Sequence, residues 1–123
     1  MEKLLEEVLT KEGVATIVTQ GLQGPHVVAT WNSYIGQDPE GALLIPAGGM
    51  KKTEANVHSG SKLTMLIGSK EIAEKMENSG AGFRLTGNAG FQSEGELFER
   101  TKERFPWARS VLVFQPEKVE RLI

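Results

Sequence analysis

The stretch PAGGMKKTEAN (residues 46–56) joins an apolar run to a short helical pattern, and it decides how the surrounding chain folds. The apolar run over residues 42–45 predicts a buried strand that ends at a proline and two glycines. A short helix is predicted directly afterwards, over residues 53–58. Such a junction offers free backbone N–H groups and the positive end of a helix dipole. Because Lys51 and Lys52 stand beside these groups, the turn suits a phosphate.

The same residues also have a purely structural explanation. The glycines make the turn, Thr53 caps the helix, and the two lysines are solvated. The stretch matches neither the Gly-x-x-x-x-Gly-Lys-Ser/Thr phosphate loop nor the Gly-x-Gly-x-x-Gly dinucleotide pattern. By residue types alone, a capped helix and a phosphate site are equally supported.

The segments on either side predict a β-dominated α+β domain. Strands are expected over residues 14–19, 26–34, 42–45, 63–67, 83–91 with an interruption near Gly87, and 111–114. Helices are expected over residues 2–10, 53–58 and 93–103, with Ser93 as an N-cap of the last one. Residues 36–41 and 117–123 are expected to be a loop and a C-terminal tail. Residues 70–78 fit a strand end, a loop or a helical turn equally well. Because the strands follow one another without regular intervening helices, we expect antiparallel pairing in a barrel or sandwich.

Size, charge and cysteine content exclude several classes of protein. The chain has 123 residues, which predicts one domain over residues 1–123. Its 14 basic and 16 acidic residues form no basic block, so no nucleic-acid partner is expected. The absence of cysteine removes disulfides, thiolate catalysis and cysteine metal sites. No apolar run approaches the ~20 residues of a membrane span, and the N-terminus is acidic, so we expect no membrane association and a cytoplasmic location.

The sequence offers no set of side chains for catalysis or metal binding. The two histidines, His26 and His58, fall in a strand and at a helix end, where packing and the helix dipole explain them. No Gly-x-Ser-x-Gly elbow occurs, and the paired glutamates fall on predicted helix surfaces. We therefore expect no catalytic residues and no metal. The first hypothesis is that the protein binds a cofactor that carries a phosphate group.

Two aromatic positions are further candidates for a ligand site. In a strand, Thr30 and Asn32 would share one face and Trp31 would lie on the other, so polar groups could bind a heterocycle's edge while the indole covers its face. Trp107 follows Phe105-Pro106 and could stack on a planar ligand. Both tryptophans could instead pack in the core or at a subunit contact, and spacing alone favours packing for Trp31 and gives it at least equal weight for Trp107.

Five motifs taken together resemble a known family. They are EGV (residues 12–14), GPH (24–26), TWNSY (30–34), GGMKKTEANV (48–57) and WAR (107–109). In this order they resemble the small FMN-binding proteins of sulfate-reducing bacteria, within the pyridoxamine-phosphate-oxidase-like split-barrel superfamily. The resemblance runs along nearly the whole chain. It implies a six-stranded antiparallel Greek-key split barrel with short flanking helices, and a homodimer with FMN at the subunit interface.

The resemblance also implies roles for individual residues. Lys52 and Thr53 should hold the phosphate, and Thr30, Trp31 and Asn32 should line the flavin. Backbone at Pro46, Ala47, Gly48 and Gly49 should meet the isoalloxazine ring, Trp107 and Leu122 or Ile123 of a partner subunit should shield it, and Glu12 should place a negative charge nearby. In one respect the chain differs: Ala29 stands where the family has an asparagine, which removes one expected hydrogen bond.

An FMN-binding redox protein is the function that these expectations favour, as a one- or two-electron carrier serving an unidentified redox partner protein. The alternative on the same barrel is a flavin-dependent oxidase or reductase of a small substrate. A third class is a non-redox module that binds haem or another ligand.

Overall fold

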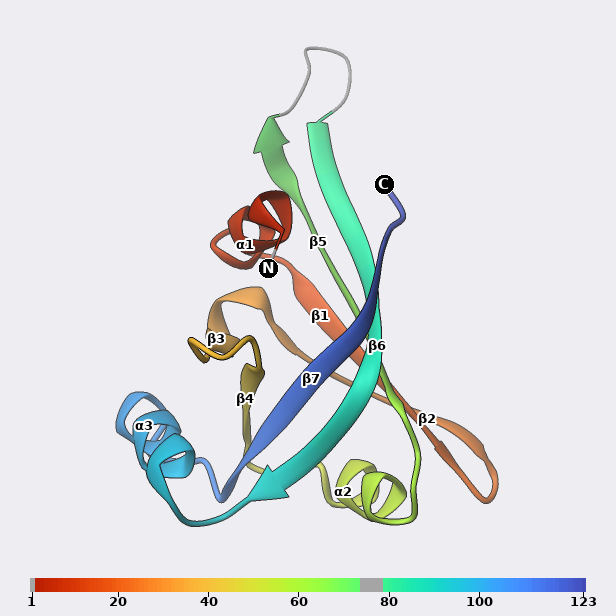
Figure 1. Ribbon diagram of the computed structural model, residues 1–123, viewed down its shortest axis with the longest axis vertical. Coiled ribbons are helices and arrows are strands. Elements are labelled where there is room, and N and C mark those ends of the chain that lie inside the picture. The colour runs from red at the N-terminus through yellow and green to blue at the C-terminus, as the bar shows by residue number, and fades with distance from the viewer. Residues whose placement is uncertain (1, 74–78) are drawn as a thin grey trace.

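One curled antiparallel sheet and three α-helices form the part of the chain that the computed structural model describes, residues 2–73 and 79–123 (Figure 1). The elements are α1 (Lys3–Leu9), β1 (Val14–Gly21), β2 (Gly24–Trp31), the 3-10 turn η1 (Asn32–Tyr34), β3 (Gly36–Gln37), β4 (Leu43–Ala47), α2 (Lys51–His58), β5 (Leu63–Ala73), β6 (Ser79–Gln92), α3 (Glu96–Arg104) and β7 (Ser110–Arg121). The strands lie in the order β2-β1-β5-β6-β7-β4-β3, and all neighbouring pairs are antiparallel.

The β-dominated split-barrel prediction is confirmed, with seven strands in place of six. The additional strand, β3, is a two-residue ladder on β4 inside the segment expected as a loop. Two residues are too few to show alternation in the sequence. The expected interruption near Gly87 is present as a register shift between Thr86 and Gly87. Strand β7 continues to Arg121, so most of the expected C-terminal tail is paired with β6.

Three local expectations were wrong. The second strand ends at Trp31, and the next three residues form the 3-10 turn η1. Helix α2 begins two residues earlier than expected, after Met50, so Thr53 is a first-turn residue and no cap. Helix α3 begins after Gly95, whose backbone φ of 98° suits glycine, and Ser93 does not cap it. Of residues 70–78, the first four extend β5, and residues 74–78 lie outside the described ranges.

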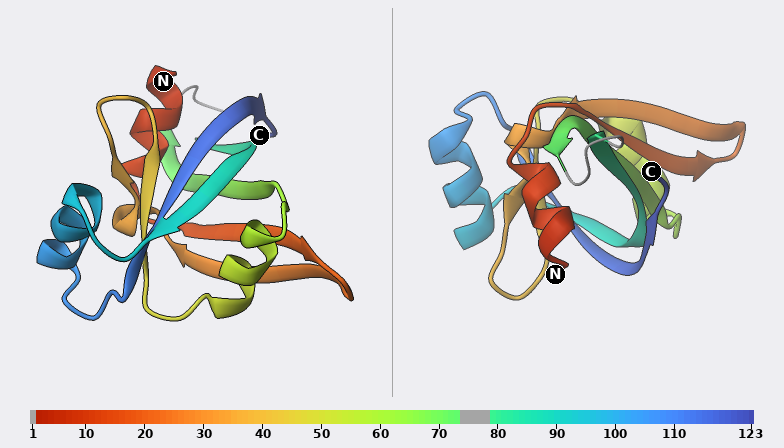
Figure 2. Two further views of the ribbon diagram at one scale, coloured as in Figure 1. Left: turned by 60° about the horizontal axis from the view of Figure 1, so that its bottom comes forward. Right: turned by 90° about the horizontal axis from the view of Figure 1, so that it is seen from above.

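The sheet curls around the main hydrophobic core, and the helices lie at its edges (Figure 2). Inward residues of alternating strand positions, such as Ile17, Met65 and Phe114, are fully buried there. Helices α1 and α2 lie at opposite ends of the sheet in Figure 1, and α3 packs outside through a second small cluster around Phe98. Among the residues described, no helix has the length and hydropathy of a membrane span.

Candidate functional site

The turn between β4 and α2 places two exposed glycines directly before a helix. Pro46 and Ala47 end β4 as buried ladder partners of Val111 and Ser110 on β7. Gly48 and Gly49 are exposed, and Met50 follows in the left-handed conformation with a φ of 62°. The backbone therefore leaves the barrel abruptly and enters α2 beside the turn end of the β1–β2 hairpin.

The first turn of α2 has unpaired polar groups where an anion would bind. Its first amide with an acceptor in the described chain is that of Glu54, 2.9 Å from the carbonyl oxygen of Met50. The amides of residues 51–53 have no hydrogen-bond acceptor among the described residues, as at any helix start without a side-chain cap. Thr53 is only 1% exposed, and its Oγ1 has no hydrogen-bond partner. A buried hydroxyl without a partner costs about 1–3 kcal/mol, which a bound acceptor would recover.

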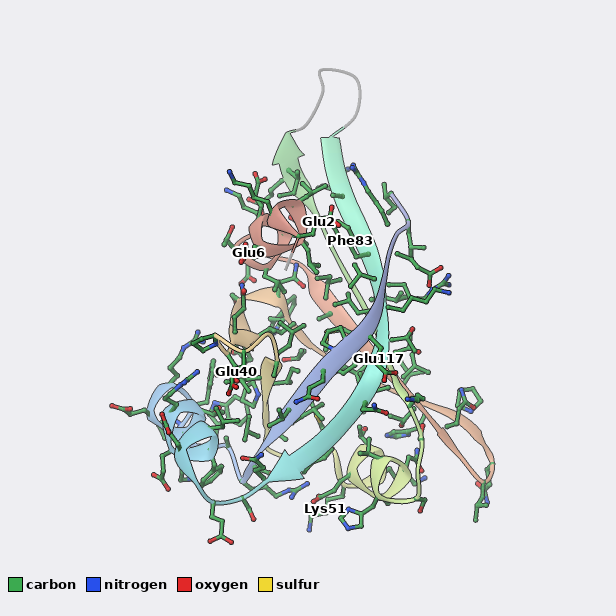
Figure 3. The ribbon with its side chains drawn as sticks, in the orientation of Figure 1. Glu2, Glu6, Glu40, Lys51, Phe83 and Glu117 are labelled. Atoms are coloured by element: carbon green, nitrogen blue, oxygen red, sulfur yellow. The ribbon has the colours of Figure 1, made fainter. Side chains whose placement is uncertain are left out.

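The two lysines of the turn are both solvent-exposed. Lys51 extends from the start of α2 at the lower end of the molecule in Figure 3. Lys52 lines a hollow of about 780 Å³ between α2 and the β1–β2 hairpin, together with His26 and Asn56. Ligand pockets commonly measure about 300–1,000 Å³. The structure thus places Lys52, rather than Lys51, beside a space large enough for a small ligand.

Helix α2 is fixed to the sheet at two points that the sequence did not reveal. Arg109 Nη2 lies 2.8 Å from Glu54 Oε1 and 2.7 Å from the carbonyl oxygen of Gly49. Asn56 Nδ2 donates to Thr19 Oγ1 over 3.1 Å. The GGMKKTEANV motif therefore combines residues whose polar groups are exposed or unpaired with residues that hold the helix. The only sequence signal for Arg109 was its place in the WAR motif.

The residues of the TWNSY motif fall into two elements, because β2 ends at Trp31 and the 3-10 turn η1 begins at Asn32. Trp31 is 48% exposed, and Thr30 is partly buried opposite Ala15 of β1. Asn32 is fully buried in η1, and its Nδ2 donates to the carbonyl oxygens of Lys11 at 3.2 Å and Gly68 at 2.9 Å. Its Oδ1 has no partner. Asn32 therefore supports the backbone with its nitrogen and has only its oxygen left for a ligand.

Glu12 contacts the TWNSY segment through Ser33. Its Oε2 accepts a hydrogen bond from Ser33 Oγ at 3.1 Å, and its side chain is exposed. It lines a hollow of about 490 Å³ with the C-terminal Ile123. Leu122 is half-exposed and does not line this hollow. The structure thus brings Glu12 near one end of the chain, and leaves Leu122 free for a contact outside the subunit.

Trp107 lies against the glycine turn of its own chain. A Cβ atom built on Gly48 would be 3.1 Å from Trp107 Cε3, so any side chain there would press on the indole and shift it by a few tenths of an ångström. The indole is 53% exposed and also contacts Phe105, with ring centroids 5.6 Å apart. An aromatic face is therefore available beside the turn. That Trp107 shields the flavin of a partner subunit stays a prediction.

Among residues 2–73 and 79–123, no three histidine or acidic side chains gather in a group that could hold a metal ion. The structure thus gathers backbone amides, the Thr53 hydroxyl, Lys52 and the half-exposed indole of Trp107 around the turn, whereas Trp31 lies at the other end of the β1–β2 hairpin from the hollow beside Lys52. Such a set can bind an anionic group and a planar ring. The class that the fold defines is a split-barrel protein, here with a glycine turn that leads into a helix whose first amides are free.

Comparison with known proteins places the chain more narrowly: it belongs to the pyridoxamine 5'-phosphate oxidase family, whose model matches residues 1–122. It is 43% identical over 117 residues to the FMN-binding protein of Nitratidesulfovibrio vulgaris, covering 95% of this chain and 94% of that one. Two solved structures share the fold. HupZ of Group A Streptococcus matches with a TM-score of 0.78 at 16% identity, over 99% of this chain and 94% of its own. An FMN-binding protein of Syntrophomonas wolfei matches with a TM-score of 0.64 at 20% identity, over 89% and 76%.

Proposed function

We propose that this chain binds FMN at the turn between β4 and α2 and acts as a redox carrier. The observation that carries the proposal is the buried, unpaired hydroxyl of Thr53, which belongs to the same first helical turn as three free amides and Lys52. This arrangement fits a phosphate monoester, because it combines hydrogen-bond donors with positive charge. The 43% identity to a protein named for FMN binding supports the choice of ligand.

The remaining site residues fit the flavin ring. Trp31 and Trp107 offer half-exposed indole faces for stacking, and the free Oδ1 of Asn32 can accept a hydrogen bond from a ring N–H. When bound, FMN supplies the electron transfer, and the protein supplies binding and electrostatic tuning. The carboxylate of Glu12 would disfavour added negative charge on the ring and so lower its reduction potential. The alanine at position 29 leaves no side-chain hydrogen bond there, so backbone groups and Thr30 must serve this part of the site.

A carrier is favoured over an enzyme by the chemistry around the turn. Among the described residues, Trp107 is the neighbour found beside Gly48, and His26 is the one histidine that lines the hollow next to Lys52, so the two histidines do not meet there as an acid–base pair. Trp107 also covers part of the space above Gly48, where a substrate would need access to the ring. The alternative remains a flavin-dependent oxidase or reductase of a small substrate. Steady consumption of NAD(P)H or of pyridoxamine phosphate by the purified protein would decide for that alternative.

We also propose that the working form is a homodimer. Exposed apolar residues gather on the outer face of β1, β2 and β5, which we define by Val14, Val27, Trp31 and Leu66. A sheet face of this kind exposed to solvent marks an interaction site. A second copy is the occupant that fits, because Trp31 of the proposed flavin site belongs to this face.

The phosphate assignment can be tested with two lysine variants. Lys52→Ala should weaken FMN binding about tenfold, since it removes a charge-assisted contact. The matched control is Lys51→Ala, which removes the same charge from the neighbouring exposed residue and should change the affinity less. Fluorescence titration of the apoprotein measures both dissociation constants.

The absorption spectrum of the purified protein tests the proposal as a whole. We expect a yellow protein that releases FMN on denaturation. Equal FMN affinity of the parent and Lys52→Ala would show the phosphate assignment to be wrong. A colourless protein that resists reconstitution with FMN would instead support a non-redox binding module.

A further inference from the structure

Arg109 links three segments that meet at the proposed flavin site. Its Nη2 donates to the carbonyl oxygen of Gly49 at 2.7 Å and to Glu54 Oε1 at 2.8 Å, and its backbone N–H donates to the carbonyl oxygen of Ala47 at 2.9 Å. One residue directly before β7 thus contacts the end of β4, the glycine turn and helix α2. We propose that Arg109, acting through Gly49 and Glu54, is a positioning residue that holds the turn ready for an anionic ligand; this rests on the proposed function.

The contact with Gly49 fixes the direction of a neighbouring N–H group. The peptide bond between Gly49 and Met50 is trans, so its C=O and N–H point in opposite directions. Because Arg109 holds the carbonyl oxygen, the amide of Met50 is directed away from the guanidinium group. That amide directly precedes the three free amides at the start of α2. Arg109 thereby sets the orientation of the backbone that leads into the anion-binding turn.

Met50 shows that this turn is held against a conformational cost. It is the single non-glycine residue with positive φ in the described chain, at 62°, a costly conformation for a residue with a Cβ atom. Such strain persists where the surroundings over-determine it, and it gathers at ligand sites. Here the surroundings are the Arg109 contact on one side and the main core, against which the Met50 side chain packs, on the other.

The ion pair with Glu54 distinguishes a positioning role from direct ligand binding. The two side chains are about one-third exposed, at 31% for Arg109 and 33% for Glu54, and lie 2.8 Å apart. Glu54 therefore offsets the charge of Arg109 at the site. If Arg109 bound the phosphate directly, removing the Glu54 charge would free the guanidinium group and strengthen FMN binding. If Arg109 positions the turn, the same change loosens the turn and weakens binding.

The test compares Glu54→Gln, Arg109→Met and Arg109→Lys with the parent. FMN titration gives the affinity, and amide hydrogen exchange of Glu54, whose N–H donates to the carbonyl oxygen of Met50, and of the α2 residues after it gives the order of the turn in the FMN-free protein. We expect Arg109→Met to bind FMN about tenfold more weakly, Glu54→Gln to bind it more weakly to a smaller degree, and both to exchange faster at the turn. Arg109→Lys, which keeps one donor, should recover part of the loss.

The matched control is Arg84→Met, because Arg84 pairs with Glu120 at 3.0 Å on the far strands β6 and β7 and loses the same charge. It should leave both readouts unchanged. Tighter FMN binding by Glu54→Gln, or exchange at the turn equal to that of the parent in Arg109→Met, would overturn the positioning role. A parent that does not bind FMN would overturn the proposed function, and the exchange rates of the FMN-free proteins would then decide the positioning role alone.

Discussion

At the scale of single residues, the turn motif contains two kinds of side chain, those without a partner in the part of the chain that the structure describes and those that hold the helix in place. The Lys52 side chain is exposed and the buried Thr53 hydroxyl has no described partner, whereas Glu54 and Asn56 are already bound to Arg109 and Thr19. The local pattern of lysines and a hydroxyl beside two glycines suits a phosphate and a capped helix equally, and it was the family resemblance that singled out the first pair as a prediction. The sequence could not predict the second pair, since the partners lie 55 and 37 positions away. Only the fold brings them together.

Gly13 is a residue whose missing side chain matters. A Cβ atom at this position would collide with the carbonyl oxygen of Gly68 and would lie 2.9 Å from Asn32 Nδ2. Gly13→Ala should therefore lower the free energy of unfolding by about 1–3 kcal/mol, through overpacking and loss of the Asn32 contacts. Urea unfolding of the FMN-free protein measures this change.

Gly90 provides the control for that substitution. A Cβ atom there would meet nothing within 4 Å. Gly90→Ala should leave stability unchanged or raise it by up to about 1 kcal/mol, because alanine restricts the unfolded chain. Equal effects of the two substitutions would contradict the tight approach of Gly13 to β5.

At the scale of elements, α2 is a short helix held by its neighbours. Eight residues are too few for a stable isolated helix, so its position depends on tertiary contacts. Arg109 holds its beginning, and Asn56 holds its end to the buried Thr19 of β1. The order of α2, which carries the proposed ligand-binding groups, therefore depends on these two contacts.

Asn56→Ala tests the second contact. Losing the 3.1 Å hydrogen bond to Thr19 Oγ1 should lower the free energy of unfolding by about 1 kcal/mol. Thr19→Val removes the same bond from the other side. Thermal or urea unfolding of both variants and of the double variant should show non-additive losses, as expected for residues in direct contact. Strict additivity would mean that the two side chains stabilise the protein independently.

The strands were more predictable than the ends of the helices. Runs of β-branched residues and turn glycines marked six strands, because each strand has its own local pattern. The starts of α2 and α3 were misjudged because neither helix uses a side-chain cap. Tertiary contacts hold Met50 at the start of α2, and Gly95 starts α3 with a positive φ that suits glycine. Thr53 and Ser93 therefore do not mark the helix starts, although capping residues of their type often do.

At the scale of the whole molecule, the outer face of β1, β2 and β5 is the surface that a monomer leaves uncovered. Its four defining residues are between 38% and 59% exposed. They lie on neighbouring strands in direct register, with Trp31 opposite Val14 and Leu66 opposite Thr16. Side chains opposite one another on paired strands share a face, so these residues form one surface.

Val27→Glu should convert the proposed dimer into a monomer, because it buries an unpaired charge in an apolar contact. Sedimentation velocity measures the change in mass. Leu22→Glu is the control: Leu22 is fully exposed at the tip of the β1–β2 hairpin, beyond the paired face, and should not affect association. A monomeric parent, or a dimer that survives Val27→Glu, would contradict an interface on this face.

The positions of the two tryptophans have an optical consequence. Trp31 and Trp107 are the chain's whole complement of indoles, and both belong to the proposed site. Nearly all of the intrinsic ultraviolet emission of this protein therefore arises within reach of a bound ring that absorbs at the emission wavelength. Ligand occupancy can be followed by quenching without any attached dye, and a phenylalanine at either position separates the two emitters.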